Sequence, residues 1–146
     1  MKFSPRLKTL MLHCVFPIFI GAGIYTFFRK KSILLFDWYE SLGFLDLILS
    51  IRYFFNSQEN IYSNFFTQSF PDGLWVYAFT YCLLIIWQGR PNSILYSITP
   101  LIIALISELG QYLSFVSGTY DKLDVITYIA SNLIAITIFK FSNYEI

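Results

Sequence analysis

Residues 73–113 read GLWVYAFTYCLLIIWQGRPNSILYSITPLIIALISELGQYL, a segment in which Arg90 and Glu108 are the only charged side chains. It contains two uncharged runs, residues 73–89 and 91–107, each of 17 residues. A membrane-spanning helix needs about 17 to 25 mostly apolar residues. Because the short Gln-Gly-Arg-Pro-Asn turn between the runs joins antiparallel neighbours, the segment predicts a hairpin of two membrane spans.

Two further uncharged runs flank this hairpin, at residues 9–28 and 125–139. Over all 146 residues, 56% are hydrophobic and 13% are charged, against about a quarter charged in soluble domains. The sequence therefore predicts one all-α domain over residues 1–146, an integral membrane bundle of four transmembrane helices. The predicted spans cover about 10–28, 73–88, 93–113 and 123–140.

The connection between the first two spans is expected to hold a short interfacial helix. Residues 43–55 are mostly apolar, and their polar positions fall on one helical stripe: Gly43, Asp46, Ser50 and Tyr53. A segment this short does not cross a bilayer alone, so we expect an amphipathic helix at the membrane surface. If residues 33–51 crossed the bilayer instead, the orientation of the first span would reverse. Residues 56–68 are expected to form a loop.

Charge and cysteine content exclude several classes of protein. The net charge is +1, with no clustered basic patch of the kind that binds nucleic acid. Cys14 and Cys82 lie in apolar runs with no disulfide framework or metal-ligand spacing, so we interpret them as small core residues. We expect no cofactor, and the sequence leaves a metal site open.

The predicted topology brings distant acidic residues to one membrane face. The second span leaves the face that carries the long connection, the third returns to it, and the fourth departs from it. Glu108 would lie roughly 8 to 12 Å below that face, and residues at i,i+3 and i,i+4 share a helix face. The candidate binding residues are Asp72, Glu108, Gln111, Asp121, Asp124, Tyr128 and Asn132.

Several of these residues also have structural interpretations. Asp72 and Asp121 are suited to cap the N-termini of the second and fourth spans, and Asp124 would complete the second cap. Asn132 is suited to interhelical hydrogen bonding. Glu108 has no capping role inside a span, where an ionisable residue costs about 2.5 to 3.5 kcal/mol and normally faces a partner or a wet cavity.

Two further residues also have a structural interpretation. Gly118 is either part of the site or a simple loop glycine. His13 lies near the opposite membrane face, and we interpret it as a hydrogen-bonded packing residue.

The pattern over residues 71–135 resembles the VanZ-like family of small multi-pass membrane proteins. The resemblance lies in the Glu-x-x-Gln of Glu108 and Gln111, in Gly118, in Asp124 opening the last span, and in Asp72 within Pro-Asp-Gly-Leu-Trp. The family's loop arginine is replaced by Thr119, and its asparagine four residues after the aspartate is replaced by Tyr128, with Asn132 one turn later.

The resemblance implies a protein of the bacterial cell (inner) membrane, with cytoplasmic termini and a link to glycopeptide resistance. Charge alone does not set the orientation, because five basic residues fall on each predicted side of the membrane.

Four functions remain open on sequence alone. The first is recognition of a polar headgroup or a lipid-linked precursor by the acidic face, with membrane lipid as the partner and a homo-oligomer as one assembly. The second is a small secondary transporter for a cation or a proton-coupled solute, although the chain lacks an internal repeat. The third is catalysis, which the sequence disfavours because it shows no nucleophile, metal or phosphate-binding motif. The fourth is a non-catalytic scaffold.

Overall fold

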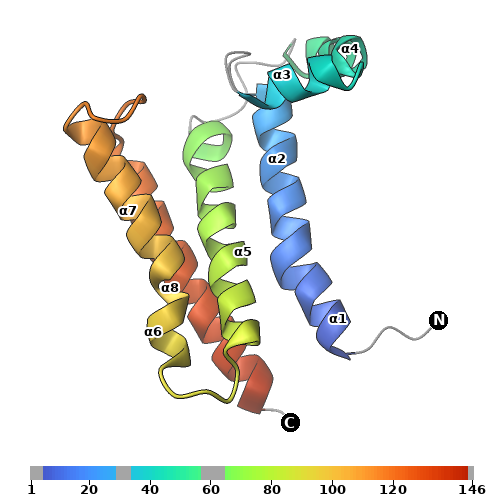
Figure 1. The fold of residues 1–146 in the computed structure, drawn as a ribbon. Coiled ribbons are helices and arrows are strands. Elements are labelled where there is room, and N and C mark those ends of the chain that lie inside the picture. Colours follow the sequence, from blue (N-terminus) through green and yellow to red (C-terminus); the bar gives the residue numbers. More distant parts are fainter. Residues whose placement is uncertain (1–4, 29–33, 57–64, 145–146) are drawn as a thin grey trace.

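The computed structural model describes residues 5–28, 34–56 and 65–144, and every regular element in these ranges is a helix. Four helices are long and apolar enough to cross a membrane: Arg6–Phe28, Phe65–Ile86, Ser93–Tyr112 and Lys122–Ser142. They run side by side along the long axis of the molecule (Figure 1). The all-α class and the number of four long apolar helices are therefore confirmed. We predicted a loop at residues 56–68. Residues 57–64 of it lie outside the described residues.

Prolines produce an irregular turn in three of the four long helices. The first combines α1 (Pro5–Leu10), a π-helical turn η1 (Met11–Val15) and α2 (Phe16–Phe28). Proline lacks the N–H that would bond to the carbonyl four residues earlier. Just before Pro17, the N–H of Phe16 accordingly bonds to the carbonyl of Met11, five residues back. Such single π turns interrupt α-helices without ending them.

The second and third long helices are also irregular just before a proline. The π turn η2 (Phe65–Ser69) leads into α5 (Phe70–Ile86), and its last residue lies two positions before Pro71. Likewise α6 (Ser93–Ser97) is joined to α7 (Thr99–Tyr112) through Ile98, two positions before Pro100. The second helix therefore begins earlier than the predicted 73. Residues 65–68, which we expected to be loop, belong to this helix.

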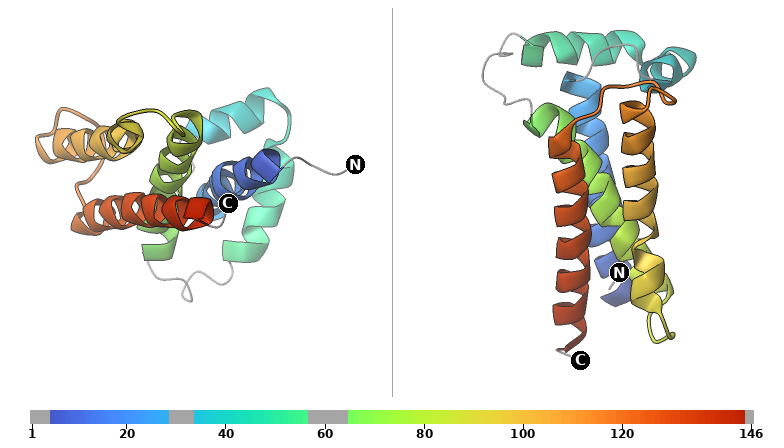
Figure 2. Two further views of the ribbon diagram at one scale, coloured as in Figure 1. Left: turned by 90° about the horizontal axis from the view of Figure 1, so that it is seen from below. Right: turned by 90° about the vertical axis from the view of Figure 1, so that its left-hand side faces the viewer.

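Two short helices lie across one end of the bundle, as both views show (Figures 1 and 2). They are α3 (Leu34–Ser41), which the sequence did not predict, and α4 (Leu45–Asn56), which matches the predicted helix at 43–55. Both are attached to the last turn of α2. The guanidinium of the buried Arg52 donates to the carbonyl of Thr26 at 2.9 Å, and the Tyr39 hydroxyl lies 2.7 Å from the Thr26 hydroxyl. A cation at the C-terminal end of a helix also complements its dipole.

Helix α5 is the centre of the bundle and packs most extensively against α8 (Lys122–Tyr144). The two backbones approach closely at Gly73, where a Cβ atom would lie 2.4 Å from the methyl group of Thr127 and 2.7 Å from the hydroxyl of Ser131. Lower in the bundle, Asn132 donates to the Thr80 hydroxyl at 2.8 Å and to the Ser97 carbonyl at 3.1 Å. Asn132 thus joins three helices, which confirms its interpretation as an interhelical hydrogen-bonding residue.

The antiparallel course of the helices decides which residues share an end. The last turn of α2, the start of α5, the end of α7 and the start of α8 all lie at the same end of the molecule, where α3 and α4 sit next to α2 (Figures 1 and 2). We call this the acidic end, because it carries Asp72, Glu108, Asp121 and Asp124.

Candidate functional site

Glu108 is the most deeply buried acidic residue of this end. It lies in the last turns of α7, and only 2% of its surface is exposed. Its Oε1 atom accepts a hydrogen bond from the backbone N–H of Asp121 at 2.7 Å. A buried carboxyl group needs such a partner, because an unpaired buried polar group costs free energy. The bond ties the end of α7 directly to the start of α8.

Asp121 is the N-cap of α8, as predicted. Its Oδ1 atom accepts a hydrogen bond from the N–H of Leu123, the second residue of the helix, at 2.8 Å. The backbone N–H of Asp121 is then the donor that Glu108 satisfies. In a capping box, an acidic residue in the third helical position would bond to this N–H from within the same helix. Here a carboxyl group from a different helix does so.

Asp124 occupies that third position, and the prediction that it completes the cap is wrong. Glu108 already accepts the N–H of Asp121, so this donor is no longer available to Asp124. Among the described residues, the buried Oδ1 atom of Asp124 has no hydrogen-bond partner. The start of α8 therefore carries one capping carboxyl group and one buried carboxyl oxygen that capping does not explain.

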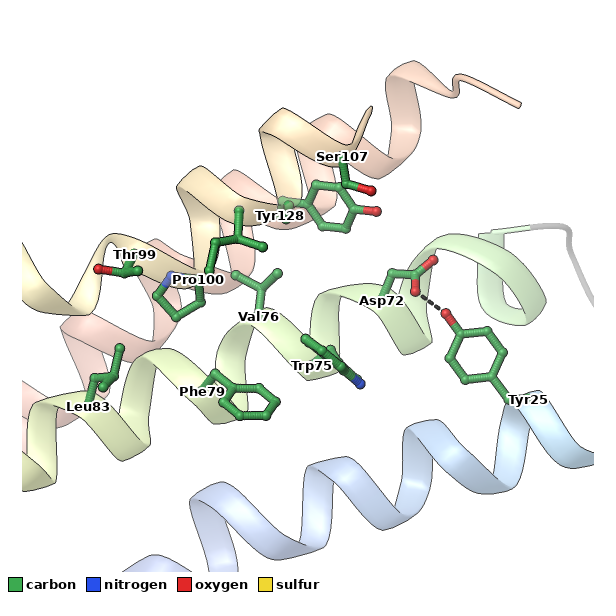
Figure 3. A pocket seen from close by; sticks show the side chains of 12 residues that line it. Tyr25, Asp72, Trp75, Val76, Phe79, Leu83, Thr99, Pro100, Ser107 and Tyr128 are labelled. Atoms are coloured by element: carbon green, nitrogen blue, oxygen red, sulfur yellow. Dashed lines mark hydrogen bonds between the residues drawn. The ribbon is translucent and has the colours of Figure 1, made fainter. Parts of the chain in front are cut away.

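Asp72 is not an N-cap either. Among the described residues the long helix extends back to Phe65, so Asp72 lies inside it, in the first turn of α5. Its Oδ1 atom accepts a hydrogen bond from the hydroxyl of Tyr25 on α2, which reaches across to it (Figure 3). The carboxyl group of Asp72 thus binds a side chain of the neighbouring helix instead of the start of its own helix.

The four acidic residues are close enough to influence one another. The carboxyl groups of Asp124, Asp72 and Asp121 all interact electrostatically with Glu108. Within the described ranges, no group of three or more His, Cys, Asp or Glu side chains has a geometry that could hold a metal ion. The arrangement gathers negative charge at one end of the bundle without forming a metal-binding cage there.

A groove runs from this end between α5 and α7, with a volume of about 620 Å³. Pockets that bind small molecules are mostly apolar, measure about 300 to 1,000 Å³ and contain a few convergent polar groups. Figure 3 shows the carboxyl group of Asp72 near the hydroxyl group of Tyr25, with the hydroxyl groups of Ser107 and Tyr128 toward the same end. The far end, beside Pro100 and Leu83, is mostly hydrocarbon but includes the hydroxyl group of Thr99. The lining residues are Tyr25, Asp72, Trp75, Val76, Phe79, Leu83, Thr99, Pro100, Ile103, Ala104, Ser107 and Tyr128.

The remaining candidate residues divide between the groove and the packing around it. Tyr128 lines the groove, whereas Asn132, one turn further along α8, does not. Gln111 packs beneath Gly118, where a Cβ atom would lie 2.7 Å from its side-chain amide carbon. Gly118 also has a φ of +142°, a conformation that side chains rarely adopt. Gly118 therefore has a steric role that a simple loop glycine lacks.

Three residues escaped the sequence analysis. Tyr25 and Ser107 contribute hydroxyl groups to the polar end of the groove, and Arg52 anchors α4 over the same end. Ser107 directly precedes the candidate residue Glu108, whereas no residue singled out in the sequence is adjacent to Tyr25. A hydroxyl group inside an apolar run gives little signal, because it can bond to its own helix backbone.

His13 lies outside this site, in a second polar cluster. Its Nδ1 atom is 2.6 Å from the hydroxyl of Tyr77, and its ring stacks on Tyr81 at a centroid distance of 4.2 Å. These contacts confirm that His13 is a hydrogen-bonded packing residue. Cys14 and Cys82 are free thiols that lie within hydrogen-bonding reach of each other.

Comparison of the chain with protein-family models, with curated proteins and with solved structures finds no match in any of the three.

Proposed function

We propose that this chain is a multi-pass membrane protein whose four long apolar helices cross the bilayer. The support is the outward exposure of large apolar side chains, such as Phe19 at 71%, Ile106 at 64% and Phe141 at 71%. Contiguous apolar surface of this kind is rare on soluble proteins and is stable in contact with lipid. Arg52, Glu108 and Asn132 are buried instead, which is the distribution that a protein in lipid requires.

We further propose that the protein recognises the polar headgroup of a membrane lipid or of a lipid-linked molecule. One observation carries this proposal: the groove between α5 and α7 is mostly apolar along its length, and most of its polar groups lie where it meets the acidic end. A molecule with a hydrocarbon tail and a polar head has the same division of chemistry. The hydrocarbon chain would lie against Val76, Phe79 and Ile103, and the headgroup would contact Asp72, Ser107 and Tyr128.

The resemblance of residues 71–135 to VanZ-like proteins adds a cellular location and a membrane orientation to the proposal. It supports a role in the bacterial cell envelope, with the protein in the inner membrane, both termini in the cytoplasm and the acidic end on the outer face. In this arrangement the headgroup would be recognised at the outer surface of the membrane. We expect binding rather than catalysis as the activity.

Native mass spectrometry of the purified protein tests headgroup recognition. Wild-type protein released from neutral micelles should retain co-purified lipid. Ala104→Phe, which fills the groove, should lose it. Ala130→Phe, which adds the same volume on an exposed face of α8, should retain it. Equal retention by both variants would contradict the proposal, provided that both remain folded by circular dichroism.

Labelling with a membrane-impermeant maleimide tests insertion and orientation. Cys14 and Cys82 are replaced by serine, and a cysteine is placed either at Gln88, between α5 and α6, or at Ser117, between α7 and α8. In intact cells the cysteine at 117 should react and the one at 88 should not. Reaction of both from the same side would refute the four-span arrangement, and the reverse pattern would invert the proposed orientation.

A further inference from the structure

Helices α3 and α4 are attached to the last turn of α2 and project beyond it. The side chains of Arg52 and Tyr39 both bind Thr26. The guanidinium of Arg52 also lies over the ring of Phe36, 5.4 Å from its centre, so the two short helices are joined to each other. Helix α4 packs mainly on α2, on the side away from α7 and α8 (Figure 2). Much of the surface of both short helices is therefore left open, and its chemistry indicates what contacts it.

The exposed surface of α4 is divided into an apolar side and a polar side. The buried Arg52 marks the side that faces α2. Leu47 and Ile51 are four residues apart and share a second side, on which they are 59% and 37% exposed. A helix with an apolar and a polar side is suited to the boundary between lipid and water. The polar side of α4 carries three exposed residues, Asp46, Ser50 and Tyr53.

Helix α3 is divided in the same way. The buried Phe36 and the half-buried Tyr39 mark the side that faces the bundle. Trp38 and Leu42, again four residues apart, share an apolar side and are 57% and 66% exposed. Two separate helices, of which the sequence predicted one, thus have the same three sides. The polar side of α3 carries three exposed residues, Asp37, Glu40 and Ser41.

The two apolar sides point in the same direction. Around each helix, at about 100° per residue, the apolar side comes directly before the side that faces the bundle, and the polar side comes directly after it. The chain runs through α3 and then α4 with α2 on the same hand throughout (Figure 2). In right-handed helices this order turns both apolar sides along α2, towards the other end of the bundle, and both polar sides away from it.

Thr26 lies at the depth of a membrane surface in the proposed setting. The long helix Arg6–Phe28 contains 23 residues, which corresponds to about 34 Å at 1.5 Å per residue. The hydrocarbon core of a bilayer is about 30 Å thick, so the last turn of this helix reaches its boundary. Helices held crosswise at this depth have lipid on one side and water on the other.

We propose that α3 and α4 form one lipid-binding platform, residues 34–56, which lies in the interface of the membrane beside α2. Its apolar side inserts between the lipid headgroups and the upper parts of the hydrocarbon chains, and its polar side faces water. This inference rests on the proposed membrane setting. It extends the interfacial helix expected at residues 43–55 to a surface of two helices with a defined lipid side. The inserted side chains are Trp38, Leu42, Leu47 and Ile51.

The platform also sets the depth of the candidate site. Tyr25 directly precedes Thr26, to which the platform is attached, and the Tyr25 hydroxyl donates to Asp72. A platform held at the interface therefore keeps Asp72 at the level of the lipid headgroups. The polar end of the groove has to lie at this level for headgroup recognition.

Tryptophan fluorescence of the full-length protein in phosphatidylcholine vesicles tests the platform. Trp75→Phe and Trp87→Phe leave Trp38 as the only tryptophan. In the same background, Trp38→Phe is combined either with Leu47→Trp on the apolar side or with Tyr53→Trp on the polar side. Quenching is measured with phosphatidylcholine that carries a spin label near the headgroup or near the end of a chain, and with iodide on both sides of the membrane.

The apolar side of an interfacial helix lies about 5 to 10 Å into the boundary between headgroups and chains. The label near the headgroup should therefore quench Trp38 and the Leu47→Trp variant at least about twofold more strongly than the label near the chain end. Iodide should quench the Tyr53→Trp variant at least about twofold more strongly than either of them. Equal iodide quenching of the Leu47→Trp and Tyr53→Trp variants would overturn the inference. Shielding of Trp38 from iodide and from both labels, as a second copy of the chain docked on the platform would produce, would also overturn it.

A control variant separates this failure from a failure of the membrane setting. Phe19 lies near the middle of Arg6–Phe28 and is 71% exposed, so the label near the chain end should quench the Phe19→Trp variant most strongly. If it does so while Trp38 and the Leu47→Trp variant respond mainly to iodide, the platform is overturned and the four-span proposal stands. If iodide also quenches the Phe19→Trp variant strongly, both proposals fail.

Discussion

Removing the carboxyl group of Glu108 should loosen the start of α8. Its Oε1 atom holds the backbone N–H of Asp121 at 2.7 Å, and it does so from another helix in a position that is 2% exposed. Glu108→Ala deletes the acceptor and leaves a buried N–H without a partner. Glu108→Gln keeps an oxygen acceptor of similar reach and removes only the charge. The two substitutions therefore separate hydrogen bonding from electrostatic repulsion.

The expected magnitudes follow from these contacts. Removing the acceptor of a buried hydrogen bond and leaving its donor unsatisfied costs about 1 to 3 kcal/mol. Glu108 also interacts with Asp124, Asp72 and Asp121, and removing one of several like charges offsets part of this cost. We expect Glu108→Ala to lower the free energy of unfolding by about 2 kcal/mol, and Glu108→Gln to change it by less than about 1 kcal/mol.

Unfolding in mixed micelles of dodecyl maltoside and dodecyl sulfate, followed by circular dichroism, measures the global effect. Hydrogen exchange of the peptide containing Asp121 measures the local effect. Glu108→Ala should accelerate exchange in the first turn of α8, whereas Glu108→Gln and the exposed control Glu40→Ala should not. If the alanine and glutamine variants unfold alike and exchange alike, Glu108 is not a cap for α8 and the reasoning is wrong.

Three further expectations concern packing. Gly118→Ala should destabilise the protein by about 1 to 3 kcal/mol because of the positive φ and the Cβ contact at 2.7 Å. Gly23→Ala, with nothing within 4 Å of the added atom, should be neutral or stabilising by up to about 1 kcal/mol; equal effects in unfolding curves would contradict the steric argument. Asn132→Ala should cost about 0.6 to 1.7 kcal/mol in the same assay, and no loss would mean that its two hydrogen bonds contribute nothing. Mild oxidation should join Cys14 to Cys82, so intact mass should drop by two hydrogens and both thiols should become unreactive after denaturation. Persistent thiol reactivity would show that Cys14 in η1 and Cys82 in α5 do not lie close together.

The sequence was sufficient to predict the four long helices and the end at which the acidic residues meet. Uncharged runs of 15 to 20 residues exclude most alternatives to long apolar helices. Once the helices alternate in direction, Asp72, Asp121 and Glu108 have to lie at the same end. This inference needs only the number of helices between two residues, so it tolerates errors of several residues in helix boundaries.

Boundaries and caps were harder to predict because they depend on local geometry that the sequence does not fix. Proline is common in the first turn of a helix, so Pro71 followed by Asp72 indicated a helix start. In the structure the π turn η2 continues the helix by five residues before Phe70. The same ambiguity did not arise at Pro17 or Pro100, because long apolar sequence precedes and follows each of them.

The exchange of roles between Asp124 and Glu108 shows a second limit. A pattern within one helix favours Asp124 as the partner of the Asp121 N–H, because the two are three residues apart. Glu108 is thirteen residues away from Asp121 along the chain, yet its carboxyl group makes the bond. Only the packing of α7 against α8 decides between them. Because Glu108 makes the bond expected of Asp124, the buried Oδ1 atom of Asp124 has no hydrogen-bond partner among the described residues.

The groove lies beyond sequence analysis for a further reason. Its walls are ordinary apolar residues, such as Val76, Leu83 and Ile103, which would be equally suitable for contact with lipid or with another helix. Helix α5 packs closely on α8 through Gly73 and less extensively on α7, and the groove lies between α5 and α7. The same glycine contact brings Asp72, its neighbour in sequence, to the end of the groove. Close packing of α5 on α8 thus positions a carboxyl group at the polar end of the groove.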